Sequence, residues 1–181
     1  MSGDGGAAAF AVAGEQVEWT GSRISVARVE VAGPDGSRHH REVVHHPGAV
    51  AVVPRHDDGT VTLVRQYRAA LDADMWEIPA GLRDVEGEPT DETARRELVE
   101  EAGLAAGTLA HLVTFHNSPG FCDEEVTVYV ATDLTEVPDD RQGIEEQHMV
   151  LARIALTEAR EMIRDGRITD AKTVIALLAL E

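Results

Sequence analysis

The sequence has little cysteine, few basic residues and no long hydrophobic run. Cys122 is the only cysteine among 181 residues, which excludes an internal disulfide and a zinc site built from several cysteines. No segment holds the ~20 consecutive apolar residues that a membrane-crossing helix needs. The first 14 residues carry no Lys or Arg ahead of a short apolar run, unlike a secretory signal. We expect a cytoplasmic protein that does not enter a membrane.

Basic residues are scarce relative to acidic ones. Sixteen Lys and Arg stand against 33 Asp and Glu, which gives a formal net charge of −17. Such a chain repels nucleic acid and anionic membranes, and no stripe of Lys or Arg compensates. We therefore expect no nucleic-acid partner. An anionic small-molecule substrate would need a bound metal ion and a few well-placed arginines to neutralise its charge.

The composition is otherwise that of one folded domain with a small addition. Hydrophobic residues make up 43% of the chain, which is ordinary for a folded protein, and the length is too short for two full domains. We expect a flexible tail at residues 1–14, a β element at 15–47 and the main domain at 48–181.

Alternating polar and apolar residues predict strands in the first third of the chain. The pattern between Val17 and His46 breaks at residues 33–36, Gly-Pro-Asp-Gly, which is typical of a hairpin. The apolar run 49–54 and the alternating run 61–67 predict two buried strands of a second sheet.

Helical spacing predicts a long helix at residues 90–103. Thr90 or Asp91 can cap its start, and Gly103 suits a left-handed stop at its end. Asp170 is a candidate cap for a later helix. The further predicted strands are 109–114, 126–131 and 149–154, and the further predicted helices are 157–165 and 170–180. This order predicts an α/β (α+β) fold with a mixed sheet between helices.

Three glutamates gather on one face of the long helix. Glu97, Glu100 and Glu101 lie within about 60° of their mean direction at ~100° per residue. Glutamates at this spacing usually form a solvated face. Carboxylates this close repel one another, and a hard cation such as Mg²⁺ would relieve that repulsion. Arg96 lies four residues from both Glu92 and Glu100, so it can brace the cluster.

The string around these glutamates is similar to a known motif. Residues 96–104, Arg-Glu-Leu-Val-Glu-Glu-Ala-Gly-Leu, follow Glu88 and Gly81 and resemble the box of the Nudix hydrolase family. Six residues separate Gly81 from Glu88 where five are usual, which lengthens a loop ahead of the helix. The segments 65–68, 76–81 and 118–121, the last containing Pro119, resemble the ADP-ribose pyrophosphatase branch. The similarity spans roughly residues 17–181.

The resemblance implies a Nudix-type α/β/α sandwich and a metal site. It makes Glu97 and Glu101 ligands of Mg²⁺ or Mn²⁺, together with the backbone carbonyl of Ala80. It makes Glu100 a further ligand or a water-mediated catalytic partner, and Glu88 a supporting residue, as are Gly81 and Arg96.

The remaining site residues come from outside the helix. The resemblance implies that a late glutamate, Glu145 or Glu146, acts as general base, and the sequence leaves this choice open. Arg68 lies near the end of a predicted strand and could clamp a phosphate oxygen. Candidate substrate contacts elsewhere in the chain are Arg41, Trp19 and Pro119.

The resemblance also implies an activity and an assembly. The activity is hydrolysis of ADP-ribose to AMP and ribose 5-phosphate by a homodimer whose β element, residues 15–47, is exchanged between protomers. One alternative is a Nudix hydrolase for another nucleoside diphosphate sugar or a modified nucleotide. Another is a ligand sensor without catalysis, although sensors tend to lose glutamates that are all present here.

Overall fold

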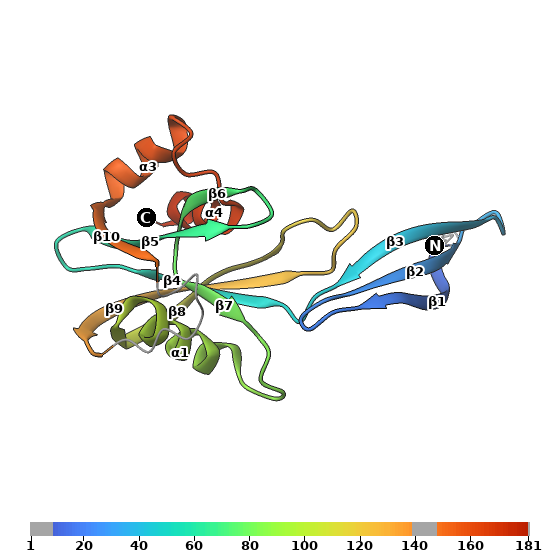
Figure 1. Cartoon of the computed structure of the whole chain (residues 1–181), viewed down its shortest axis with the longest axis horizontal. Helices are drawn as coiled ribbons and strands as arrows, with labels where there is room; N and C mark the ends of the chain where they lie inside the picture. The colour runs from blue at the N-terminus through green and yellow to red at the C-terminus, as the bar shows by residue number, and fades with distance from the viewer. Residues whose placement is uncertain (1–8, 139–147, 181) are drawn as a thin grey trace, which may run out of the picture. The chain divides into compact units, whose positions relative to one another are not determined.

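The computed structural model describes residues 9–138 and 148–180, which belong to two compact units. The N-terminal unit holds the described residues up to Pro47 together with Ser118–Glu124, and the main unit holds Gly48–Asn117 and the described part of Glu125–Glu181. The strands are β1 (Ala11–Thr20), β2 (Ser25–Ala32), β3 (Arg38–His45), β4 (Ala49–Pro54), β5 (Thr60–Arg68), β6 (Ala73–Glu77), β7 (Ala80–Leu82), β8 (Leu104–His116), β9 (Glu125–Glu136) and β10 (Val150–Ala155); the helices are α1 (Thr90–Ala102), α3 (Leu156–Arg164) and α4 (Ala171–Ala179) (Figure 1).

The N-terminal unit is an antiparallel sheet in the order β1-β2-β3. Its β2–β3 turn lies at the predicted Gly-Pro-Asp-Gly segment, where Gly36 has a φ of +81°, a conformation that glycine adopts without a steric cost. The prediction of this hairpin is confirmed. The prediction of a tail up to Gly14 is wrong for its last four residues, because β1 begins at Ala11 and pairs there with Ala32 of β2. Pairing with β2 holds these small residues extended despite their low strand propensity.

A loop from later in the chain completes the N-terminal unit. The Val44 N–H donates to the Phe121 carbonyl at 2.7 Å, and the Asp123 N–H donates to the Val44 carbonyl at 3.2 Å. The Asp123 carboxylate also lies 2.6 Å from His45 Nδ1, and this hydrogen bond raises the pKa of His45. These bonds attach the segment that contains Pro119 to β3.

The main unit contains two sheets. One has the order β7-β4-β9-β8, with β4 parallel to β9 and the other pairs antiparallel; the second is antiparallel in the order β10-β5-β6. The expectation that residues 49–54 and 61–67 share one sheet is wrong. Strand β4 pairs with β7 and β9, whereas β5 pairs with β10 and β6.

Strand β4 divides the core into two halves. All six of its residues are buried, and successive side chains point to opposite faces of the sheet. Val50 and Val52 pack in the cluster that contains α1, whereas Ala51 and Val53 pack in the cluster that contains α3 and α4. Helix α1 therefore covers one face of the mixed sheet and α3 and α4 cover the other (Figure 1). This arrangement confirms the predicted sandwich.

The ends of the helices follow the predictions in part. Gly103 closes α1 with φ 63° and ψ 33°, the left-handed stop that was predicted, and Asp170 caps α4 by accepting the Thr173 N–H at 3.0 Å. The prediction that Thr90 or Asp91 caps α1 is wrong, since Pro89 holds the cap position and makes no side-chain bond there.

Among the residues the structure describes, no helix has both the length and the apolar character needed to span a membrane.

Candidate functional site

Helix α1 directs two glutamates into the main unit. Glu97 and Glu101 are one helical turn apart and are only 9% and 4% exposed. The apolar residues Ala94, Leu98 and Ala102 lie beside them and pack on β4 and β9. The buried face of α1 is therefore wider than its apolar stripe, and it includes two carboxylates where a purely structural helix would place apolar side chains.

Strand β7 lies directly against these two carboxylates. The Ala80 N–H donates to Glu101 Oε2 at 2.9 Å. A Cβ atom at Gly81 would come within 1.9 Å of the Glu97 carboxyl carbon, so only glycine leaves room for that carboxylate. The contact of Ala80 that the structure defines uses its N–H, and the role of its carbonyl as a metal ligand stays a prediction.

Arg96 braces the remaining acidic residues, as expected from its position. Its Nη1 donates to Glu97 Oε1 at 2.7 Å and to Glu100 Oε2 at 3.2 Å, and its Nη2 lies 3.3 Å from Glu88 Oε2. Thr93 Oγ1 also donates to Glu88 Oε2 at 2.7 Å, and these two bonds lower the pKa of Glu88. One arginine thus gathers Glu88, Glu97 and Glu100 around the start of the buried face.

The ionised form of Glu97 is poorly stabilised by the protein alone. Burial raises its pKa from 4.5 to about 7, and the charge of Glu100 acts in the same direction, while Arg96 opposes both. The pKa of Glu97 therefore rises although it forms a salt bridge with Arg96, because the loss of hydration outweighs the attraction of one guanidinium. A further positive charge beside Glu97 would favour its ionised form.

These residues fit a divalent cation in the chemistry of their donors. Among the described residues, no three Asp, Glu, His or Cys side chains already converge as a metal cluster, because Glu97 turns to Arg96 and Glu101 to Ala80. The available donors are nevertheless all oxygens, which hard cations prefer. A buried carboxylate with a raised pKa beside a second buried carboxylate is the arrangement that such a cation would stabilise.

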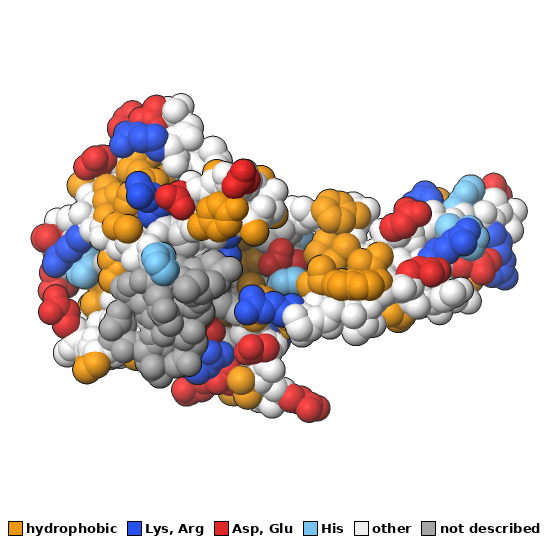
Figure 2. Space-filling model, in the orientation of Figure 1, with side chains coloured by type: hydrophobic (Ala, Val, Ile, Leu, Met, Phe, Trp, Pro, Cys, Tyr) orange, Lys and Arg blue, Asp and Glu red, His pale blue; other side chains and the backbone are white. Residues whose placement is uncertain are grey.

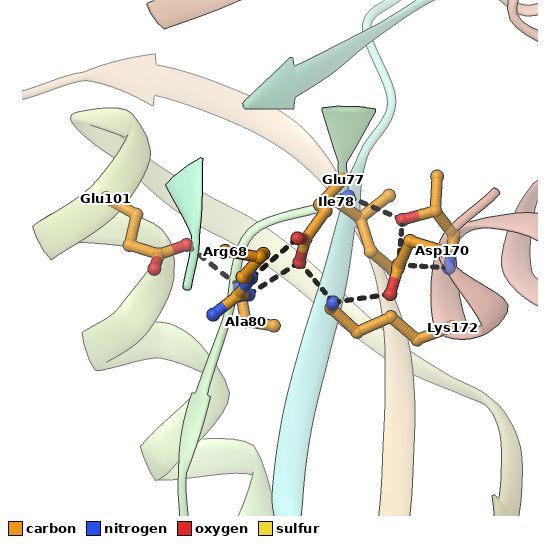
Figure 3. A network of polar contacts seen from close by, with 8 residues as sticks. Arg68, Glu77, Ile78, Ala80, Glu101, Asp170 and Lys172 are labelled. Atoms are coloured by element: carbon orange, nitrogen blue, oxygen red, sulfur yellow. Dashed lines mark hydrogen bonds and ion pairs between the residues drawn. The ribbon is translucent and has the colours of Figure 1, made fainter. Parts of the chain in front are cut away.

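A second buried carboxylate system lies on the other side of β7 (Figure 3). Glu77 is 1% exposed and accepts two hydrogen bonds from Arg68, from Nε at 2.7 Å and from Nη2 at 2.6 Å. Lys172 of α4 donates to the same carboxylate at Oε2. Burial acts to raise the pKa of Glu77, but Arg68 and Lys172 outweigh it and hold that pKa below its ordinary value.

The start of α4 extends this network. Asp170 accepts from Lys172 Nζ at 3.0 Å and from Thr173 Oγ1 at 2.6 Å. The same Thr173 hydroxyl oxygen accepts the Ile78 N–H at 2.9 Å. Helix α4 therefore contacts both the side chain of Glu77 and the backbone of the residue that follows it, two residues ahead of Ala80.

Arg68 connects the network to the glutamates of α1. The bonds to Glu77 raise the pKa of Arg68, and the charges of Glu101 and Asp170 add to this effect. The paired nitrogens are Nε and Nη2, and its side chain keeps 41% of its surface exposed. The predicted phosphate-binding arginine thus lies beside the predicted metal ligand Glu101, with part of its side chain open to solvent.

Sequence reasoning gave no role to Glu77 or Lys172, and it treated Asp170 only as a helix cap. Glu77 lies inside the stretch 76–81 that carries the family resemblance, so its buried position could have been suspected. Lys172 has a plainer signal, since it is the only lysine in the chain. Its partner across the fold could not be read from spacing, because Glu77 and Lys172 are 95 positions apart.

The structure does not bring every predicted site residue to this place. Arg41, Trp19 and Pro119 belong to the N-terminal unit, where Trp19 is 54% exposed and lies on β1. Glu145 and Glu146 lie outside the described residues. The residues that the main unit does bring together are Ala80, Gly81, Glu88, Arg96, Glu97, Glu100 and Glu101, with Arg68 beside them.

Comparison with known proteins identifies a family and several relatives. Residues 44–176 match the family model of the NUDIX domain. The chain is 42% identical over 161 residues to an ADP-ribose pyrophosphatase of Mycobacterium tuberculosis, and the aligned region covers 89% of this chain and 78% of that protein. It is 36% identical over 170 residues to an ADP-ribose pyrophosphatase of Bacillus subtilis, and the aligned region covers 94% of this chain and 91% of that protein.

A solved structure shares the same fold. The crystal structure of an ADP compounds hydrolase superposes with a TM-score of 0.80 at 25% sequence identity, over 94% of this chain and 91% of that one. The match extends over nearly the whole length of both chains. The mixed sheet between helices is therefore the architecture of a known hydrolase.

Proposed function

The chain belongs to the Nudix family, and from that premise we propose that it hydrolyses the diphosphate bond of ADP-ribose to AMP and ribose 5-phosphate. Two relatives that match most of its length are ADP-ribose pyrophosphatases, and the matching solved structure is an ADP compounds hydrolase. The observation that carries the proposal is the pair of buried carboxylates, Glu97 and Glu101, one helical turn apart and packed against β7.

The metal of this reaction is a divalent cation, which Nudix hydrolases in general require, and we propose Mg²⁺ or Mn²⁺. Glu97 and Glu101 would hold it with the Ala80 carbonyl, and Glu100 would bind directly or through water. When bound, the ion neutralises the charge of the diphosphate and lowers the pKa of a bound water. Gly81 leaves the space that the Glu97 carboxylate needs, and Arg96 and Glu88 fix the cluster from outside.

The rest of the chemistry belongs to side chains around this pair. Arg68 would bind a phosphate oxygen by a charge-assisted hydrogen bond. Glu145 or Glu146 would take the proton of the attacking water. The water oxygen then bonds to one phosphorus, the bridging oxygen leaves with the other phosphate, and the proton stays on the glutamate until it is released to solvent.

We further propose that the working form is a cytoplasmic homodimer, in which β1 to β3 contribute to the partner's substrate site. Support comes from the exposed hydrophobic side chains of this unit, which include Phe10, Val12, Val17 and Trp19 at 52–70% exposure. Figure 2 shows hydrophobic side chains on its visible face. Trp19, Arg41 and Pro119 are the residues we expect to contact the nucleoside, while the β element at 15–47 and the main domain at 48–181 keep the separate roles expected from the sequence.

The proposal is tested with a substrate panel. Purified protein is incubated with ADP-ribose, several nucleoside diphosphate sugars and nucleoside triphosphates, with Mg²⁺, Mn²⁺ or a chelator. We expect AMP and ribose 5-phosphate from ADP-ribose at a rate well above the others, and none with the chelator.

Two variants tie the activity to the proposed ligands. Glu97→Gln and Glu101→Gln should each lower kcat by roughly 100-fold or more, the scale on which removing a metal or its ligand acts, while circular dichroism stays unchanged. Faster turnover of another nucleoside diphosphate sugar would favour the alternative hydrolase, and binding without turnover would favour the sensor. Full activity in either variant would refute the ligand assignment.

A further inference from the structure

Lys172 is a buried cation that the proposed reaction does not yet use. It is the only lysine beside fifteen arginines, and its side chain is 12% exposed. Its ammonium contacts two carboxylates, Glu77 and Asp170. Removing a long, charged side chain from water costs free energy that its ion pairs must offset. A buried position of this kind is not explained by the usual role of lysine in keeping a protein surface soluble.

The charges of the network balance only when Lys172 is included. Arg68 and Lys172 carry two positive charges, and Glu77 and Asp170 carry two negative charges. Without Lys172, the buried carboxylate of Glu77 would be neutralised by Arg68 alone, and the group as a whole would carry one net negative charge. A substrate diphosphate that approaches Arg68 would then meet a guanidinium whose charge is already balanced by Glu77, and it would be repelled by the remaining negative charge of the group.

The hydrogen bonds to Glu77 also fix the orientation of the Arg68 guanidinium. Arg68 approaches Glu77 along its edge with Nε and Nη2, while Lys172 approaches Oε2 of the same carboxylate from α4 (Figure 3). Two donors on different elements hold the plane of the Glu77 carboxylate, and that plane sets the orientation of a bidentate guanidinium. A carboxylate with only one partner could rotate together with it.

We propose that Lys172 is a positioning residue, which acts through Glu77 to orient Arg68 and to leave its positive charge available to a phosphate of the substrate. Asp170 supports it by holding the ammonium and by capping α4. The inference rests on the proposed function of Arg68 as the phosphate-binding arginine. It assigns a role in substrate affinity to a helix near the C-terminal end of the chain, far in sequence from α1.

A purely structural role makes a different prediction from this one. If Lys172 only stabilised the attachment of α4, its loss would lower the melting temperature and the fraction of folded enzyme, and KM would stay the same. If it acts through Arg68, KM rises in protein that is fully folded, and kcat changes little, because binding to ground state and transition state weakens together.

The test uses the full-length protein with Mg²⁺ and ADP-ribose as the varied substrate. Lys172→Met removes the charge at similar length and should raise KM roughly tenfold, the low end of what a hydrogen bond to a charged group supports, with kcat within about twofold. Lys172→Arg keeps the charge and should keep KM within about threefold of wild type. The matched control is Arg164→Met, which removes a cation of an exposed pair on α3 and should leave KM unchanged.

A double-mutant cycle separates action through Arg68 from a direct effect. Arg68→Met should raise KM by itself, and adding Lys172→Met to it should change KM by less than about twofold, since coupled residues are not additive. Multiplicative effects of the two substitutions would overturn the proposal. So would an unchanged KM in folded Lys172→Met.

The outcomes stay distinct from failure of the proposed function. If the wild type turns over another nucleoside diphosphate derivative faster than ADP-ribose, the same cycle is run on that substrate, and the substrate assignment alone fails. If Lys172→Met does not fold, Lys172→Gln, which keeps a donor without a charge, takes its place. Loss of folding in both variants would show a structural role and would overturn the proposal.

Discussion

The substitution Glu97→Gln should stabilise the metal-free protein while it abolishes metal binding. Glu97 has a pKa of about 7 in the folded chain against an ordinary value of 4.5, chiefly because burial disfavours its charge. The ionised side chain therefore destabilises the fold, and a pKa difference of this size corresponds to about 3 kcal/mol. Glutamine has nearly the same shape and can still accept the Arg96 hydrogen bond, but it carries no charge.

The sign of the effect with pH follows from the raised pKa. Below pH 4.5 the carboxyl is protonated in both folded and unfolded chains, so the variant and the wild type should be equally stable. As the pH rises from 4.5 to about 7, the unfolded chain ionises first and the wild type loses stability. Above that range the penalty of the wild type is complete, and the variant should melt roughly 5–10 °C higher for a chain of this length.

The assay is thermal unfolding with a chelator and with excess Mg²⁺, at pH 5 and pH 8. In the chelator at pH 8, the variant should exceed the wild type; with Mg²⁺ the wild type should regain stability, because a ligand that binds only the folded state stabilises it, and the variant should not respond. Glu86→Gln, at an exposed loop position, controls for net charge. Equal stability of variant and wild type in the chelator at pH 8, or an equal Mg²⁺ response, would refute the reasoning.

Three further predictions concern the same site. Gly81→Ala places a methyl carbon within 1.9 Å of the Glu97 carboxyl carbon and should weaken Mg²⁺ binding at least tenfold, measured by calorimetry; unchanged affinity would show that this carboxylate is not a ligand. The Mg²⁺ affinity of the wild type should rise as the pH increases to about 7 and then level off, because protons compete for Glu97 below its pKa; a flat profile from pH 5.5 to 8.5 would contradict this. Only one of Glu145→Gln and Glu146→Gln should reduce kcat, by roughly 100-fold, and near-normal rates in both would exclude this segment as the source of the base.

Local patterns predicted the elements whose causes are local. The helix 90–102 followed from its spacing, and its end followed from Gly103, since a left-handed residue needs no distant partner to be recognised. The β2–β3 hairpin followed from its turn for the same reason. The first four residues of β1 were missed because three of them are Ala or Gly, which carry little strand signal, and only the ladder with β2 holds them extended.

The candidate site, like the fold, could be predicted from the sequence only where its residues are close together in the chain. The glutamates of α1 form a continuous motif, so their grouping was visible, but their depth was not. Glutamates at this spacing usually form a solvated face, whereas Glu97 and Glu101 are buried beside Leu98. The pairing of Glu77 with Lys172 depends on how α4 returns to β6, and such long-range contacts leave no trace in local spacing.

A solitary lysine also makes the enzyme unusually simple to probe by amine chemistry. Acetic anhydride or a succinimidyl ester finds only one side-chain amine in this polypeptide, and that amine, on the first turn of α4, contacts two carboxylates. The extent of acylation at this position, read by mass spectrometry, would report directly on how often the start of α4 opens. Any reagent that reaches it would remove the cation that Glu77 and Asp170 share and leave every other charged side chain as it was.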